Sequence, residues 1–173
     1  KPRGYNLKTQ GRVALFASQL DDQLALLKKA CDGLTTTQLE WQLKPGMNTV
    51  GMLLAHLAVV EVFWLIVAAH EIADEAAIDK LSIKTIGIAM DDDGLPLKAE
   101  GKHPQTLAGW DLSGYMKTVD KARKAVHKEL RTWKDSDLSK TFKRGKYTIT
   151  REWTIYHVLE HFAGHFGQVL MLK

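Results

Sequence analysis

The chain has 173 residues, which is in the usual range of one domain and enough to bury a core without disulfide bonds. We therefore expect residues 1–173 to form a single domain. The 24 basic and 20 acidic residues are interspersed and give a formal net charge of +4, a small excess that argues against nucleic acid or a membrane as a partner. The single cysteine, Cys31, excludes an internal disulfide bond and is typical of a cytoplasmic protein.

The first predicted helix spans Arg12 to Cys31. Its apolar residues recur at spacings of three and four, the period of one helix face. They are Val13, Phe16, Leu20, Leu24 and Leu27. A short helix is predicted next, because Thr35 stands three residues before Gln38, as in a capping box. We expect Cys31 to be a half-buried helical residue rather than a reactive thiol.

The second long helix is predicted to be capped by Asn48 or Thr49 and to run to about Ala77. Its most apolar stretch, residues 50–69, is interrupted by His56 and by one glutamate and has no flanking membrane anchors. The sequence therefore predicts a buried helix rather than a membrane span.

Residues 84–110 contain several glycines and two prolines, which predict a long connection between the second and third long helices. The acidic triplet at residues 91–93 lacks the alternating spacing of a calcium loop and is expected to be a solvated turn. The third long helix is predicted from about Leu112 to Trp133. The last helix is predicted to begin near Arg151, after a short extended segment at residues 147–150.

Long helices with little strand content predict an all-α fold, an antiparallel four-helix bundle with a long connection between helices 2 and 3. The densest basic run, from Lys140 to Lys146, is expected to be a solvated loop.

Three of the seven histidines, His157, His161 and His165, follow one another at intervals of four residues. Four residues turn a helix by about 400°, so each ring is displaced by only about 40° and about 6 Å from the previous one. His161 and His165 can therefore bind one ion, as paired helical histidines do in zinc sites.

His56 lies among apolar residues of the second long helix. A lone histidine there is usually held by a hydrogen bond to a carbonyl or hydroxyl group. The pair on the last helix favours a metal site instead, because side chains of facing bundle helices converge on metals. Three neutral imidazoles would leave an open coordination position, as in catalytic sites, and Zn, Ni, Fe and Mn all suit them.

Several motifs resemble the DinB-like family. They are Gly33-Leu-Thr-Thr-Thr-Gln-Leu-Glu-Trp41, Lys44-Pro-Gly-Met-Asn-Thr49, Met52-Leu-Leu-Ala-His-Leu57 and His157-Val-Leu-Glu-His-Phe-Ala-Gly-His-Phe-Gly-Gln168. The resemblance implies a four-helix bundle, frequently a homodimer, that binds one divalent metal ion through His56, His161 and His165.

Characterised relatives in this family include bacillithiol-dependent thiol S-transferases, a mycothiol-dependent maleylpyruvate isomerase and a domain of sulfoxide synthases. The chain departs from these relatives at residues 164–166, which read Gly-His-Phe where relatives often carry a second histidine and an arginine before Gly-Gln. Any anion-binding role of that arginine therefore does not transfer to this chain.

Two other metal-site patterns fit less well. His157-Val-Leu-Glu-His161 matches the inverted zinc-peptidase motif, but no later carboxylate ligand follows in the printed sequence. A di-iron bundle needs helical Glu-x-x-His pairs, and only Glu100 and His103 have that spacing, in the glycine-rich connection.

The remaining polar side chains have supporting or surface roles. His157 and Gln168 are candidates for groups that support the ligands, and a solvent-facing His157 is an equal alternative. His70, His103 and His127 are expected at the surface.

Two functional interpretations remain open. The first is a metal-dependent enzyme that acts on a small molecule, either a thiol S-transferase using a low-molecular-weight thiol or a hydrolase. The second is a non-catalytic metal-binding or stress-associated bundle protein. No Asp or Glu is expected beside the three histidines to act as a general base. A metal-bound thiol needs no separate base, which favours S-transfer.

Overall fold

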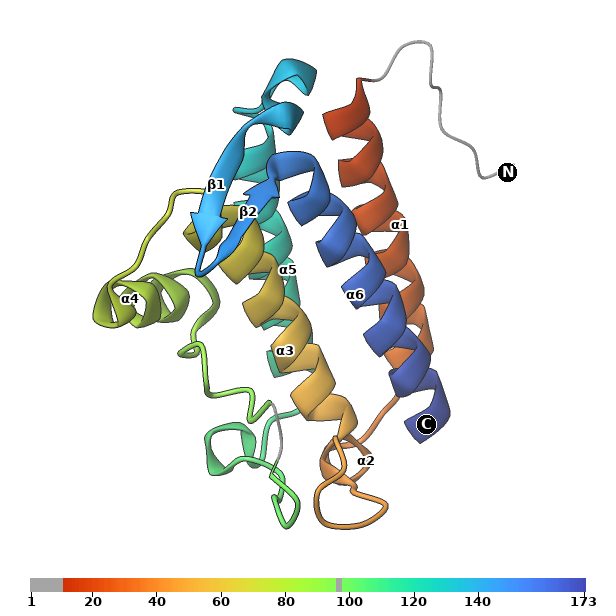
Figure 1. Cartoon of the computed structure of the whole chain (residues 1–173). Coiled ribbons are helices and arrows are strands. Elements are labelled where there is room, and N and C mark those ends of the chain that lie inside the picture. Colours follow the sequence, from red (N-terminus) through yellow and green to blue (C-terminus); the bar gives the residue numbers. More distant parts are fainter. Residues whose placement is uncertain (1–10, 96–97) are drawn as a thin grey trace, which may run out of the picture.

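The computed structural model of the chain describes residues 11–95 and 98–173. Its four long helices lie side by side (Figure 1): α1 (Arg12–Cys31), α3 (Val50–Val62), α5 (Leu112–Leu130) and α6 (Arg151–Leu172). α3 and α1 each pack against both α5 and α6, so the long helices enclose a shared core. The predicted all-α character is confirmed, and α1 and α6 begin at the predicted residues.

Side-chain caps explain where several helices begin. Thr35 forms the predicted capping box with Gln38 at the start of α2 (Thr36–Glu40). Thr49 caps α3 by accepting a hydrogen bond from a backbone N–H of the first turn. α1 is capped from a distant part of the chain, because the carboxylate of Asp135 accepts hydrogen bonds from its first two backbone N–H groups.

The second long helix ends earlier than predicted. α3 continues into a π-helix, η1 (Phe63–Ala68), and the chain then turns instead of remaining helical to Ala77. A separate helix, α4 (Glu75–Ile86), follows and was missed by the prediction. Asp74 caps its first turn, and Gly87, with a φ of +94°, ends it in the left-handed conformation.

A β-hairpin leads into α6. β1 (Thr141–Arg144) and β2 (Tyr147–Thr150) pair antiparallel, with Thr141 opposite Thr150. The prediction of a solvated loop for the basic run is therefore wrong, since four of its residues form a strand. β2, rich in β-branched and aromatic residues, needs a partner strand, and the basic run supplies it. Two 3₁₀ turns, η2 (Gln105–Leu107) and η3 (Asp135–Ser139), lie in the connections before and after α5.

α3 and η1 together form an apolar core helix. Residues Val50–Ala68 are long and apolar enough to cross a membrane by length and composition, but 78% of the most apolar stretch is buried inside the structure. Gly51 allows a close approach to α5, because a Cβ atom at this position would lie 2.5 Å from the hydroxyl oxygen of Tyr115. This segment is packed as the core helix of a globular protein, as the sequence predicted.

A buried ion pair joins α3 to α5. Glu61 is 1% exposed and accepts hydrogen bonds from Nε and Nη2 of Arg123 at 3.0 and 2.6 Å. Nη1 of Arg123 donates to Asp21 of α1 at 3.1 Å. Burial alone would lower the pKa of Arg123, but the two carboxylates hold it above its usual value, so the guanidinium stays charged. Arg123 of α5 therefore links three of the long helices, through Glu61 of α3 and Asp21 of α1.

Cys31 is fully buried at the end of α1, more than the sequence suggested, and burial raises the pKa of its thiol to about 11. Because the thiolate is the reactive form, we expect the native protein to react with a disulfide reagent such as DTNB far more slowly than the unfolded protein at mildly alkaline pH. The release of the coloured thiol, followed with and without guanidinium, measures both rates. Equal rates would contradict the buried position.

Candidate metal centre

Three histidines meet between two of the long helices. His56 comes from α3, and His161 and His165 come from one face of α6. Nε2 of His161 lies 3.2 Å from Nε2 of His56 and 3.1 Å from Nε2 of His165. The ligand nitrogens of all three lie within 4.8 Å of one another. The structure thus brings together the three residues predicted as ligands, and their binding of an ion stays a prediction.

The spacing of these nitrogens fits a metal ion. Two imidazole nitrogens bound to zinc at about 2.0–2.1 Å with tetrahedral angles lie about 3.3 Å apart. The two shortest spacings here, 3.1 and 3.2 Å, are close to that value. The donor set of three imidazoles suits Zn, Ni, Fe or Mn and does not choose among them.

Hydrogen bonds on the far sides of two rings direct their lone pairs inward. Nδ1 of His56 lies 2.8 Å from Oδ2 of Asp93, and Nδ1 of His165 lies 3.1 Å from Oε1 of Gln168. An oxygen acceptor requires the proton on Nδ1, which leaves a bare lone pair on Nε2. Both lone pairs then face Nε2 of His161, and a cation among them would replace their mutual repulsion by coordination.

Asp93 is the site residue that sequence reasoning missed. It is 1% exposed, and its second carboxylate oxygen accepts a hydrogen bond from the backbone N–H of Leu95 at 2.9 Å. The prediction that residues 91–93 form a solvated turn is therefore wrong for Asp93, and so is the prediction that no carboxylate lies beside the histidines. No local pattern could have found it, because it follows His56 by 37 residues and reaches the ring only through the fold of the connection.

The surroundings of His161 and His165 favour the neutral form of both rings. Burial, together with the neighbouring His165, His56 and His157, lowers the pKa of His161 to about 3. Burial also lowers the pKa of His165. Both rings are therefore unprotonated at neutral pH, and a metal ion would not have to displace a proton from a charged imidazolium.

His157 lies outside the group of three nitrogens. Its ring centroid is 5.8 Å from that of His161, and the ring stacks on Trp153 at 4.6 Å. Its Nδ1 lies 3.2 Å from a carboxylate oxygen of Glu160. The cluster pairs His161 with His56 and His165 rather than with His157, which disfavours the inverted zinc-peptidase arrangement.

The other histidines differ in exposure. His70 is exposed, as expected. His103 is not a surface group, because it is half-buried with Nδ1 2.8 Å from the hydroxyl of Thr49, and burial lowers its pKa. His127 is partly buried against Asp21, 2.8 Å away.

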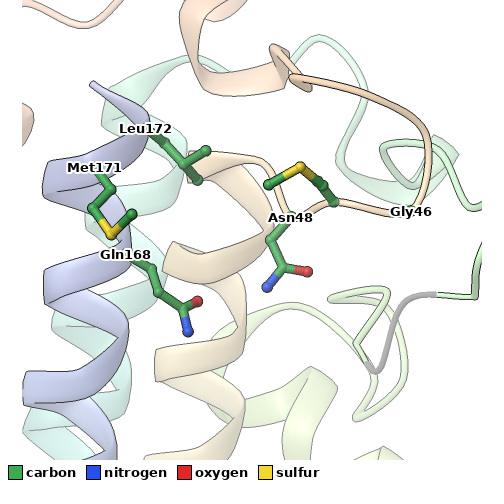
Figure 2. Close-up of a pocket in the computed structure, with 6 residues that line it drawn as sticks. Gly46, Asn48, Gln168, Met171 and Leu172 are labelled. Atoms are coloured by element: carbon green, nitrogen blue, oxygen red, sulfur yellow. The ribbon is translucent and has the colours of Figure 1, made fainter.

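A cavity adjoins the cluster on the side of Gln168. It has a volume of about 310 Å³ and lies between the C-terminal end of α6 and the segment before α3. Figure 2 shows the amides of Gln168 and Asn48 directed into the space between the two helices, with Met171 and Leu172 above them. The cavity is therefore linked to the cluster through Gln168, which lines it and whose Oε1 lies 3.1 Å from Nδ1 of His165.

Comparisons with known proteins support the fold and identify the family. No protein with a curated functional description matches the chain. A crystal structure described as the conserved protein of a locus from Enterococcus faecalis has the same fold, with a TM-score of 0.69 and 14% identity over 95% of this chain and 96% of that one. The family model of the DinB superfamily matches residues 19–169, which include all three clustered histidines. The chain therefore belongs to the DinB superfamily.

Proposed function

We propose that the protein is an antiparallel four-helix bundle that binds one divalent transition-metal ion through His56, His161 and His165 and catalyses transfer of a thiol. The observation that carries the proposal is the convergence of three imidazole nitrogens within 4.8 Å of one another. Membership of a superfamily that often binds metals supports it. The proposal also includes a cytoplasmic location, for which the single cysteine is the support, and a homodimer, for which the family resemblance is the support.

The side chains around the cluster favour a thiol over water as the attacking group. When bound, the ion would supply Lewis acidity that keeps a coordinated thiol in its thiolate form. Among the described residues, the group of side chains that could hold a metal ion consists of the three histidines and includes no carboxylate. Both carboxylate oxygens of Asp93 are already engaged, one with His56 and one with the backbone N–H of Leu95, which disfavours Asp93 as a base for water. A thiolate needs no such base.

Cobalt substitution tests the thiol proposal. Protein loaded with Co²⁺ is expected to develop a sulfur-to-cobalt charge-transfer band in the near ultraviolet when a low-molecular-weight thiol such as cysteine, glutathione or 2-mercaptoethanol is added. The His161→Ala variant serves as the control and should show no band. A cobalt-loaded protein whose spectrum is unchanged by all three thiols would contradict the proposal.

A non-catalytic metal-binding role is the second candidate. It is favoured by the position of the cluster, because an ion held by His56 and His165 would tie α3 to α6. An ion used only for structure should raise the melting temperature strongly, and its removal by a chelator should lower it. A small shift together with thiol binding would favour the catalytic role.

A further inference from the structure

A second cavity, which we call the aromatic pocket, lies on the other side of the cluster from Gln168. Its volume of about 640 Å³ is within the range of small-molecule sites. Its walls include Trp64 of η1, Arg144 and Tyr147 of the hairpin, and Trp153 and His157 of α6. The pocket is therefore built by η1 on one side and by the consecutive hairpin and α6 on the other, two parts of the chain about 80 residues apart.

Aromatic rings form one wall of the pocket. The rings of Trp64 and Trp153 lie 5.5 Å apart at 72°, and Trp153 stacks on His157 at 4.6 Å. Trp153 remains 41% exposed although it is one of the largest apolar side chains. Trp64 belongs to the π-helix, and such turns occur frequently at functional sites. This wall offers flat apolar surface to a planar molecule.

Arg144 brings positive charge to the rim of the pocket. Its guanidinium lies 4.6 Å from the ring centroid of Phe63, and it makes no ion pair with any residue that the structure describes. The hairpin is held in place beside it, because the backbone N–H of Lys143 donates to a carboxylate oxygen of Glu71 at 3.1 Å. A guanidinium with free donors matches the two oxygens of a carboxylate.

His157 connects the pocket to the histidine cluster. It lines the pocket, and its ring centroid is 5.8 Å from that of His161. We infer that the aromatic pocket binds the second substrate of the metal centre, a molecule with a planar apolar body and a carboxylate group. The role of the bound molecule as a second substrate rests on the proposed function. The binding of a planar carboxylate in the pocket depends only on the aromatic rings and on Arg144.

The binding is tested with a matched pair of probes, 2-naphthoate and its neutral analogue 2-naphthamide, by isothermal titration calorimetry. Naphthoate is expected to bind the wild-type protein saturably and more tightly than the amide. Arg144→Gln should weaken naphthoate binding about tenfold and leave the amide unchanged, because it removes one charge-assisted contact. Trp153→Leu should weaken both probes. Arg131→Gln, an exposed arginine at the end of α5 and outside the pocket, should change neither.

The same titrations on metal-loaded and chelator-treated protein separate this inference from the proposed function. Naphthoate binding that persists without metal and depends on Arg144 supports the pocket even if no ion is ever bound. Naphthoate binding that requires the ion and is unchanged in Arg144→Gln would overturn the inference while leaving the metal centre intact. Equal affinities of both probes for the wild-type protein, or no saturable binding of either, would also overturn it.

Discussion

The Arg123→Met variant is expected to lose about 3–5 kcal/mol of unfolding free energy, because Glu61 would stay buried without its counter-charge. Glu61 is 1% exposed and receives two hydrogen bonds from Arg123, so no water can replace the lost partner without opening the core. Methionine keeps most of the side-chain volume, which limits the contribution of a cavity. Urea unfolding followed by circular dichroism measures the loss.

Two further variants identify the cause of this loss. The double variant Glu61→Leu with Arg123→Met removes both charges and is expected to be more stable than Arg123→Met alone, since no unpaired charge remains. Lys124→Met changes an exposed neighbour on α5 and should stay within about 0.5 kcal/mol of the wild type. An Arg123→Met variant as stable as Lys124→Met would show that the ion pair is not needed to keep Glu61 in the core.

The Asp93→Asn variant is expected to bind the metal ion about 10–100-fold more weakly than the wild type. The carboxylate accepts the Nδ1 proton of His56 at 2.8 Å, which orients the ring and leaves the Nε2 lone pair for the ion. A neutral amide is a weaker acceptor, and its NH₂ group can donate to Nδ1 and so move the proton to Nε2. Competition with a chromogenic chelator measures the affinity.

Asp91→Asn is the matched control for this variant. Asp91 belongs to the same acidic triplet but is exposed, so its replacement should leave the affinity unchanged. Equal weakening in both variants would point to a general effect of negative charge near the site. Wild-type affinity in Asp93→Asn would show that the hydrogen bond to His56 does not support the ligand.

The sequence correctly predicted those helices that carry strong local signals. It missed features that depend on contacts between distant parts of the chain. The apolar period of α1 and the capping box of α2 lie within the elements themselves, and both predictions hold. α4 was missed because Asp74 and Gly87 were not recognised as its two ends. The cap on α1 comes from Asp135, 123 residues from Arg12, and no local rule can supply it.

The same distinction applies to the candidate site. The spacing of His161 and His165 on one helix face indicated a chelating pair, and the polar ring of His56 in an apolar helix indicated a third partner. Asp93 carried no such signal, because its role arises only when the connection folds over α3. The aromatic pocket needs the hairpin to lie beside η1 and α6, which the predicted loop did not suggest.

The metal content of the protein tests the central proposal most directly. Protein purified without a histidine tag, supplied with transition metals and dialysed, should contain about one ion per chain by inductively coupled plasma mass spectrometry. His56→Ala and His161→Ala, each removing a ligand from a different helix, should lose most of it while remaining folded by circular dichroism. A wild-type protein without bound metal, or full retention of the ion in both variants, would contradict a site formed by these histidines.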